Sequence, residues 1–458
     1  MLIRYGLPSL IGIALLSMAV VAVATGREPV IPMDAEKSMK HIQILTQEIG
    51  SRPSGLDNEK KAADYIARYF KELSYATHLQ SFPGFVQTVG KIRVQDGEKF
   101  FGKGKHGFSR WHSTVWETGA AVNGRMTEGQ AVCGRIVPVD ASNAVFPDAL
   151  KGNIALVEKT EAPLAGLIKK AEEAGAAAVI VYNTLGKKGN LGEAFYPAVD
   201  PVDIPVLGAA KAHGLWLLEM LEQGPVTVDI ETRHYPKTIS NNIVAVKPAK
   251  TDNAPIIGII GHYDSKVGAA GAWDNASGAS TVMELARVLK SYDTGHVELR
   301  FIAFGSEEVG GHMGASFYVS QLSKEEIVRF SAVVCIDGVG VSHTESIHLY
   351  CRSVDGMINP IMQSALTTAT RMKYPTLILA KSGFSDHREF HEAGITAVMF
   401  TSLAGEGSTG FYHTGAYSLT PYYHTIQDTI EEAISQSRLQ EQITVIAQTV
   451  YDVVDKLK

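Results

Sequence analysis

Seven side chains in the second half of the chain are of the kinds that bind metal ions or transfer protons. They are His262, Asp264, Asp274, Glu307, Glu308, Asp337 and His424. Most of them closely follow a short apolar run, as His262 and Asp264 follow Ile256–Ile260. Several carboxylates in one buried pocket repel one another unless a cation neutralises them. Two histidines with several carboxylates, and no cysteine, suit a pair of divalent ions of the zinc type.

The elements that must position these side chains alternate along the chain after residue 240. Apolar runs of strand length occur at Ile256–Ile260, Val297–Phe304, Ser331–Ile336 and Ile395–Phe400. Helical patterns lie between them, for example over 276–290. Such alternation predicts an α/β fold in which a mostly parallel mixed sheet has helices on both faces. The carboxyl ends of parallel strands meet at one edge of a sheet, where ligands bind, so the seven side chains are expected to converge there.

The first 25 residues (1–25) are predicted to be a signal peptide or a membrane anchor. Arg4 precedes the almost wholly apolar run Leu7–Val23, and Ala22-Val23-Ala24 fits a small-residue cleavage site. The apolar stretch Tyr5–Thr25 is also long enough to span a bilayer. Both interpretations predict that the rest of the chain lies outside the cytoplasm, either secreted or anchored by this segment, which would be its only link to a membrane.

The composition argues against several classes of function. A net charge of −6 leaves no overall basic surface, which argues against a nucleic-acid partner. Only three cysteines occur, so the fold does not depend on a disulfide framework. No Cys-x-x-Cys pair is present, which argues against a thiolate zinc site. A length of 458 residues predicts two domains.

The motifs around the seven side chains resemble those of one enzyme family. They are GHYDS, GAWDNASGASTVMELAR, FIAFGSEEVGGHMGASFYV, VCIDGVG, SGFSDHREF and YYHTIQDT, together with IGSRPSGLDNEKKAADYI near the N-terminus. In their order and spacing they resemble the co-catalytic di-zinc exopeptidases, which include secreted bacterial aminopeptidases, glutamate carboxypeptidases and the metal-free transferrin-receptor ectodomain. The resemblance covers roughly residues 40–458.

A middle segment of the chain resembles a different module. Its phrases GNIALVEK, KKAEEAGAAAVIVYN and IPVLGAAKAHG are similar to those of a protease-associated domain. The resemblance therefore implies a peptidase domain in two parts, 36–85 and 235–458, with a β-rich protease-associated domain inserted at 86–234. Such an insertion would shape or cover the active site, or would only add stability.

The resemblance implies a site for two zinc ions per chain. Asp274 would be the carboxylate that bridges both ions. His262 and Asp337 would complete one zinc site. Glu308 and His424 would complete the other.

The resemblance also implies roles for residues beside the metals. Glu307 would be the general base, which takes a proton from the metal-bound water and passes it to the leaving amine. Asp264 would hold the ring of His262 in orientation. Tyr423 would stabilise the tetrahedral intermediate through its hydroxyl, with simple packing and a competing Tyr422 as the alternatives.

Other residues that could act in such a site have weaker signals. Asp386 and His387 match a family phrase near the substrate pocket, and a structural role explains them equally well. His413 lies in a YHT phrase like that of His424 but lacks the downstream QDT, so His424 is the predicted ligand. The remaining histidines are expected to be ordinary, namely His312, His343, His348 and His391.

Release of N-terminal amino acids from peptides is the function that the resemblance favours. A carboxypeptidase or dipeptidase on the same scaffold would need a basic group for the substrate carboxylate, for which Arg388 and Arg352 are the candidates. A glutaminyl-cyclase-like acyltransferase uses a single zinc, and a receptor-like binding protein would have lost ligands. All five ligand positions are filled here, which argues against both. The residue preference, the native metal and the oligomeric state stay open.

Overall fold

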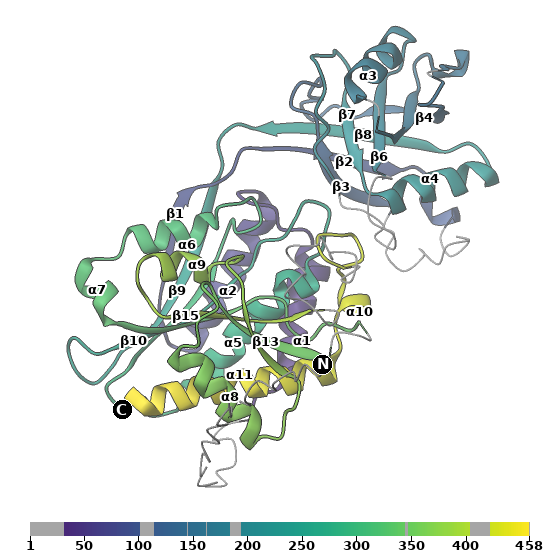
Figure 1. Ribbon diagram of the computed structural model, residues 1–458. Coiled ribbons are helices and arrows are strands. Elements are labelled where there is room, and N and C mark those ends of the chain that lie inside the picture. Colours follow the sequence, from purple (N-terminus) through teal and green to yellow (C-terminus); the bar gives the residue numbers. More distant parts are fainter. Residues whose placement is uncertain are drawn as a thin grey trace, which may run out of the picture. The chain divides into compact units, whose positions relative to one another are not determined.

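The peptidase part of the chain is built on one mixed sheet, as the sequence predicts. The computed structural model describes residues 32–100, 114–143, 145–161, 163–183, 194–343, 347–403 and 422–457. In these residues an eight-stranded sheet has helices on both faces, and a second group of strands closes into a barrel (Figure 1). The predicted α/β fold with a β-rich insertion is therefore confirmed.

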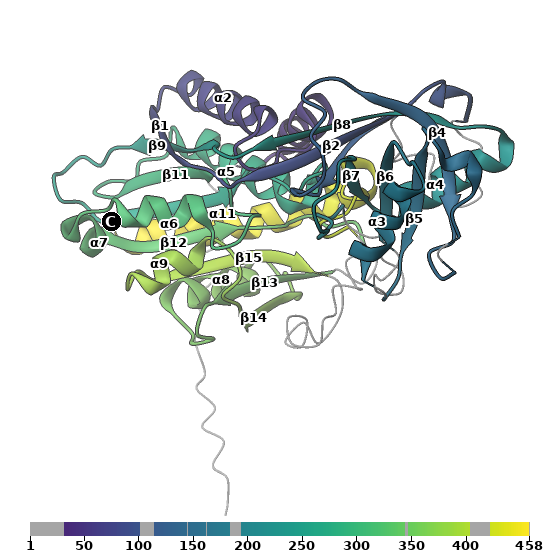
Figure 2. The ribbon, with the colours of Figure 1, turned by 90° about the horizontal axis from the view of Figure 1, so that it is seen from above.

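Four parallel strands form the centre of the large sheet. In spatial order the strands are β1 (Ala76–Pro83), β9 (Ile239–Lys247), β11 (Glu298–Phe304), β10 (Ile256–His262), β12 (Phe330–Ile336), β15 (Ala397–Leu403), β13 (His348–Ser353) and β14 (Leu377–Lys381). Strands β11, β10, β12 and β15 run parallel. Antiparallel pairs flank them, β1 with β9 and β9 with β11 on one side and β15 with β13 on the other. Figure 2 shows β9, β11, β12 and β15 in this order across the sheet, in which β10 lies between β11 and β12.

Both faces of the central strands are buried under helices, because successive side chains of a strand point to opposite faces. Ile257 and Ile259 of β10 belong to the core beneath one group of helices. That group consists of α1 (Ala35–Gln43), α2 (Asp57–Glu72), α5 (Ser277–Leu289), α8 (Pro360–Arg371) and α11 (Gln436–Leu457). Ile256 and Ile260 face the opposite core, with α6 (Met313–Ser320) and α9 (His387–Glu392). This two-sided burial explains why the sequence of β10 is almost wholly apolar.

The inserted segment forms the closed barrel. Its strands are, in spatial order, β2 (Gln87–Val94), β3 (Val115–Ala120), β7 (Val206–Ala209), β6 (Ala178–Asn183), β5 (Ile154–Lys159), β4 (Val132–Val139) and β8 (Thr227–Tyr235). The helices α3 (Leu164–Glu173) and α4 (Lys211–Gln223) lie between barrel strands in the sequence. Trp216 and Leu217 of α4 join a core with barrel residues such as Ile180 and Leu207. The domain boundaries at 86 and 234 stay predictions.

Two short helices complete the peptidase part, α7 (Lys324–Arg329) and α10 (Ile430–Ala433). Across the ranges that the structure describes, none of the helices has the length and apolar character needed to cross a bilayer. The predicted signal peptide or anchor at 1–25 lies outside those residues.

A glycine at the start of α5 lets this helix approach the end of β12 closely. A Cβ atom on Gly278 would lie 2.1 Å from the carbonyl oxygen of Ile336 and 2.3 Å from Oδ1 of Asn275. The amide of Asn275 bonds to both neighbours, because its Oδ1 accepts from Gly278 N at 2.8 Å and its Nδ2 donates to Ile336 O at 3.0 Å. The turn before α5 and the end of β12 are thus fixed to each other.

Replacing this glycine should destabilise the peptidase part. We expect Gly278→Ala to lower the free energy of unfolding by about 3 kcal/mol, because the methyl group would meet backbone that cannot move aside easily. Gly166→Ala is the matched control, since Gly166 is exposed in α3 and its added Cβ meets nothing within 4 Å. Thermal unfolding measured by circular dichroism should show a lower Tm for Gly278→Ala alone. An unchanged Tm would contradict the tight contact.

Candidate metal centre and active site

The carboxyl ends of three adjacent parallel strands bring most of the predicted site residues together. His262 is the last residue of β10, Glu307 and Glu308 follow β11, and Asp337 follows β12. The chain turns at Ala272–Ala276 (η5), immediately before α5, and this turn carries the next ligand candidate, Asp274. His424 comes from the segment before α10.

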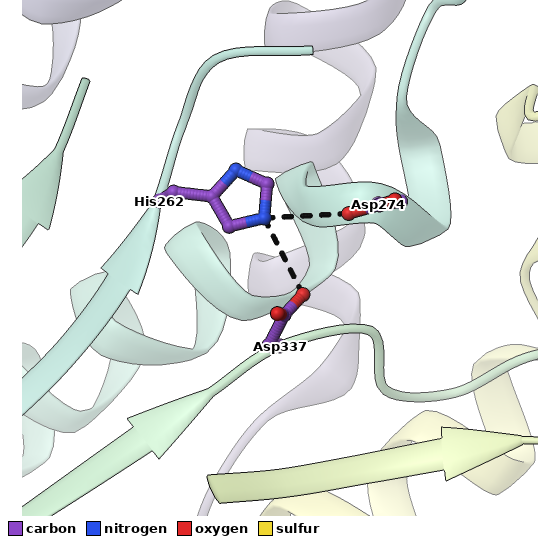
Figure 3. A group of neighbouring side chains, drawn as sticks. All are labelled: His262, Asp274 and Asp337. Atoms are coloured by element: carbon purple, nitrogen blue, oxygen red, sulfur yellow. Dashed lines mark ion pairs between the residues drawn. The ribbon is translucent and has the colours of Figure 1, made fainter. Parts of the chain in front are cut away.

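These residues form two groups that share Asp274. In the first group, Nε2 of His262 lies 3.3 Å from Oδ1 of Asp274 and 3.4 Å from Oδ1 of Asp337 (Figure 3). In the second, Nε2 of His424 lies 3.2 Å from Oδ2 of Asp274 and 2.9 Å from Oε2 of Glu308. Within each group one ligand atom per residue lies within 4.8 Å of the others. The two oxygens of Asp274 therefore face different histidines.

The donor set and its spacing fit zinc. Zinc–nitrogen and zinc–oxygen bonds are about 2.1 Å long, so two ligands of a tetrahedral ion lie about 3.4 Å apart. The distances around His262 Nε2 match that separation. Among the described residues, Nε2 of His262 and Oε1 of Glu308 are buried without a hydrogen bond. Buried polar atoms normally have partners, and a cation between these groups would supply one.

The pKa values of two residues in the cluster also indicate an excess of negative charge that a cation would balance. Burial raises the pKa of Glu307 well above its usual range, and the nearby Glu308 and Asp337 carboxylates raise it further against the opposing effect of His262. Burial by itself lowers the pKa of His262, but the carboxylates of Glu307 and Asp337 outweigh it and raise that pKa well above 6.5. Both shifts reflect the excess of buried negative charge in this cluster.

Asp264 connects the candidate ligand His262 to the loop after β11. Its Oδ1 lies 3.3 Å from Nδ1 of His262, on the side of the ring away from the other carboxylates. The same carboxylate accepts hydrogen bonds from the backbone N–H groups of Glu307 and Glu308, both at 3.1 Å. Asp264 is fully buried. One carboxylate thus orients an imidazole and the loop that carries two further site residues.

A cavity of about 190 Å³ opens above the two groups. Its lining residues are Lys266, Trp273, Asp274, Glu307, Glu308, Gly310, His312, Asp337, Phe384, Met399, Thr401, Leu403, Tyr423 and His424. The tyrosine ring of Tyr423 stacks on His424, with centroids 3.6 Å apart. Tyr422 instead lies with its hydroxyl 3.2 Å from Oγ of Ser342. Of the two tyrosines that the sequence left in competition, Tyr423 is the one that lines the cavity.

The structure adds His312 to the site, although the sequence pattern marks it as ordinary. Its Nε2 lies 3.6 Å from Oε1 of Glu307, and its Nδ1 lies 3.1 Å from Oε1 of Glu389. His312 therefore links Glu307 to a carboxylate of α9. In the sequence, the only sign of this role is that His312 follows Glu307 by five residues. Such spacing cannot reveal that a loop residue contacts a helix that lies far along the chain.

Of the other candidates, Asp386 and His387 are buried and do not line the cavity, and His413 lies outside the described residues. Asp386 is fully buried, and burial, together with its carboxylate neighbours, raises its pKa well above its usual range against the effect of His262. His387 lies with Nε2 2.7 Å from the backbone oxygen of Ser382, and burial lowers its pKa to about 4. His413 lies outside the described residues.

Two buried residues that the sequence analysis passed over hold the turn η5 in place. The guanidinium of Arg52 donates to the backbone oxygens of Ala270 at 2.6 Å and Gly271 at 3.1 Å. Asp428 accepts from the N–H groups of Trp273 at 2.7 Å and Asp274 at 3.0 Å. Both residues lie inside motifs quoted above, IGSRPSGLDNEKKAADYI and YYHTIQDT, but only the tertiary structure shows what they contact.

Comparison with known protein families agrees with the geometry. Residues 241–450 match peptidase family M28, and residues 118–217 match the PA domain. The PA match lies within the segment that forms the barrel, and the M28 match contains both groups of candidate ligands.

Individual relatives extend the match over almost the whole chain. The aminopeptidase YwaD of Bacillus subtilis is 32% identical over 437 residues, which is 93% of this chain and 87% of that protein. The crystal structure of BSAP, described as a zinc aminopeptidase from Bacillus subtilis, superposes with a TM-score of 0.63 at 32% identity and covers 93% of this chain and 96% of that one. An aminopeptidase from Aneurinibacillus sp. strain AM-1 gives a TM-score of 0.54 at 27% identity and covers 92% of this chain and 94% of that one. The chain therefore belongs to peptidase family M28 and carries a PA domain within its peptidase fold.

Proposed function

We propose that the chain is a zinc-dependent aminopeptidase that binds two zinc ions and releases N-terminal amino acids from peptides by hydrolysis. Membership of family M28 and the 32% identity to an aminopeptidase over 437 residues support metallo-aminopeptidase activity. The count of two ions rests on one observation, the carboxylate of Asp274 between two histidines. In this proposal the enzyme is exported, with the peptidase domain at 36–85 and 235–458 and the PA domain at 86–234.

The five proposed ligands divide into two sets around Asp274. His262 and Asp337 hold one ion with it, and Glu308 and His424 hold the other. When bound, the zinc ions act as Lewis acids that polarise the scissile carbonyl and lower the pKa of water.

Glu307 is the proposed general base. It lies beside both groups without belonging to either, with Oε2 3.9 Å from Nε2 of His262. Its carboxylate removes a proton from the attacking water and delivers it to the nitrogen of the leaving amine. One ring nitrogen of His312 faces Glu307 and the other faces Glu389. His312 is therefore held by Glu389 and orients the carboxylate of Glu307.

Asp264 and Tyr423 have supporting roles in this proposal. Asp264 fixes the ring of His262 through Nδ1, which leaves Nε2 directed at the ligand carboxylates. Tyr423, stacked on His424 in the lining of the cavity, donates a hydrogen bond from its hydroxyl to the oxyanion that develops on the scissile carbonyl.

The alternatives from the sequence receive less support. A single-zinc cyclase would need only one of the two groups, and a receptor without catalysis would need neither. Arg352 is buried against the ring of Tyr350, and Arg388 is paired with Glu392 on the surface of α9. Neither arginine is among the residues that line the cavity, so neither supports a carboxypeptidase.

The number of ions and the sharing of Asp274 are testable together. We expect the purified protein to contain two zinc ions per chain by mass spectrometry, and dialysis against a chelator to abolish hydrolysis of leucine p-nitroanilide. Asp274→Asn should lose most of both ions, because each group contains Asp274, whereas His424→Ala should lose one. His296→Ala, at an exposed position, is the control and should keep both. A single ion in the wild type, or full zinc in Asp274→Asn, would refute the shared ligand.

Replacing Glu307 tests whether this residue acts in catalysis or binds a metal ion. We expect Glu307→Gln to lower kcat by a factor of about 10² to 10⁴, because the amide cannot take the proton of water. Zinc content should stay at the wild-type value, because Glu307 belongs to neither ligand group. Glu325→Gln, exposed on α7, is the matched control and should keep full activity. Loss of zinc from Glu307→Gln would make Glu307 a ligand instead.

Asp428 positions the shared ligand through the backbone of η5. Both of its carboxylate oxygens accept N–H groups, one of them from Asp274 itself. We expect Asp428→Asn to weaken zinc binding about tenfold, because the amide keeps only one acceptor oxygen and leaves a buried N–H unpaired. Competition with a fluorescent chelator measures this, with the exposed Asp252→Asn as control. Equal zinc affinity in both variants would show that η5 does not need Asp428.

A further inference from the structure

One lysine lies within the otherwise acidic cavity. Lys266 follows β10 by four residues, and its Nζ donates to the backbone oxygen of Glu308 and lies 3.5 Å from Oε2 of the same residue. The side chain stays one-third exposed, at 33%. Lys266 lines the cavity, so a molecule bound there can contact its side chain.

Lys266 is the only lysine or arginine among the described residues that line the cavity. The other charged lining residues are carboxylates, namely Asp274, Glu307, Glu308 and Asp337. In the zinc-loaded enzyme two divalent ions would balance the charges of these four carboxylates. Lys266 would then be the cationic side chain of the lining with which a carboxylate of the substrate could pair.

The order of the strands separates the lysine from the apolar part of the lining. Lys266 reaches from the end of β10 to the loop after β11, whereas Met399 and Leu403 belong to β15. Strand β12 lies between β10 and β15 and carries Asp337 at its end. The cavity thus has an apolar side at β15, and the lysine lies beside Glu308 on the side of β10 and β11, with Asp337 at the end of the strand between them.

We propose that Lys266 determines specificity by binding a carboxylate on the leaving-group side of the substrate. This inference rests on the proposed aminopeptidase function. An apolar N-terminal side chain then lies against β15, the scissile bond lies over the ligand groups, and the carboxylate of the next residue meets the ammonium group. The favoured substrates are short peptides with an apolar first residue and a carboxylate close behind it, either the free C-terminus of a dipeptide or the side chain of Asp or Glu in the second position.

Matched substrates with and without the carboxylate test this assignment on the zinc-loaded enzyme. The pairs are Leu-Gly with Leu-Gly amide, for the C-terminal carboxylate, and Leu-Glu amide with Leu-Gln amide, for a side-chain carboxylate. We expect the wild type to prefer the acid member of at least one pair about tenfold in kcat/KM, with the difference mainly in KM. High salt should shrink the preference, because the lysine is partly exposed and ions screen such pairs.

Variants of the lysine distinguish recognition from simple charge compensation. Lys266→Met should reduce the preference ratio to about one, and Lys266→Arg should keep most of it. Lys250→Met is the control, because Lys250 pairs with Asp293 at an exposed position and should leave the ratio unchanged. If Lys266 only neutralises Glu308, its loss will lower kcat/KM equally for the acid and amide members. That result would overturn the proposal.

The same measurements separate this inference from the function on which it rests. If Lys266→Met removes the preference for the acid member in only one of the two substrate pairs, that pair shows whether the lysine binds a C-terminal or a side-chain carboxylate. A wild type that cleaves all four peptides without preference overturns the role of Lys266 and leaves the aminopeptidase function standing. A zinc-loaded wild type that cleaves neither the peptides nor leucine p-nitroanilide overturns both.

Discussion

The carboxylate of Asp274 faces two histidines at once, and the arrangement of the rest of the site depends on it. One oxygen lies 3.3 Å from His262 and the other 3.2 Å from His424, although these histidines are separated by most of the peptidase domain in the sequence. Such a position tolerates little displacement of the backbone. The turn that carries Asp274 is accordingly fixed by Asp428, by Arg52 and by the close approach of Gly278 to β12.

Many carboxylates are buried at one edge of the sheet, so hydrogen-bond donors and positive charges must balance their negative charge. Asp264 disperses its charge over the ring of His262 and two backbone N–H groups. Arg52, fully buried, supplies a fixed positive charge behind η5, and burial lowers its pKa to about 10, which keeps it charged at neutral pH. The remaining negative charge faces the cavity, where two divalent ions would neutralise it. In the proposed enzyme the metal would therefore contribute to the electrostatic balance of the fold as well as to the reaction.

In the proposed mode of substrate binding, specificity would come from side chains that the sheet brings to the same cavity from different strands. The apolar residues of β15 and the lysine after β10 belong to separate loops and strands on either side of Asp337. Changes in either would alter the preferred substrate without touching a proposed ligand. This separation of binding groups from ligands is the physical basis for assigning Lys266 a role in recognition.

The sequence by itself determined the fold class, the family and the local elements, because apolar periodicity and motif spacing are local properties. The predicted helix over 276–290 and the predicted strand Ser331–Ile336 differ from α5 (Ser277–Leu289) and β12 (Phe330–Ile336) by at most one residue at each end. Only the tertiary structure decided which residues share the cavity. His312, Asp428 and Lys266 owe their positions to contacts with Glu307, η5 and Glu308, and the two arginines considered for substrate binding lie outside the lining. Such contacts join loops from different strands, and their geometry follows from the packing of the whole sheet rather than from any local pattern.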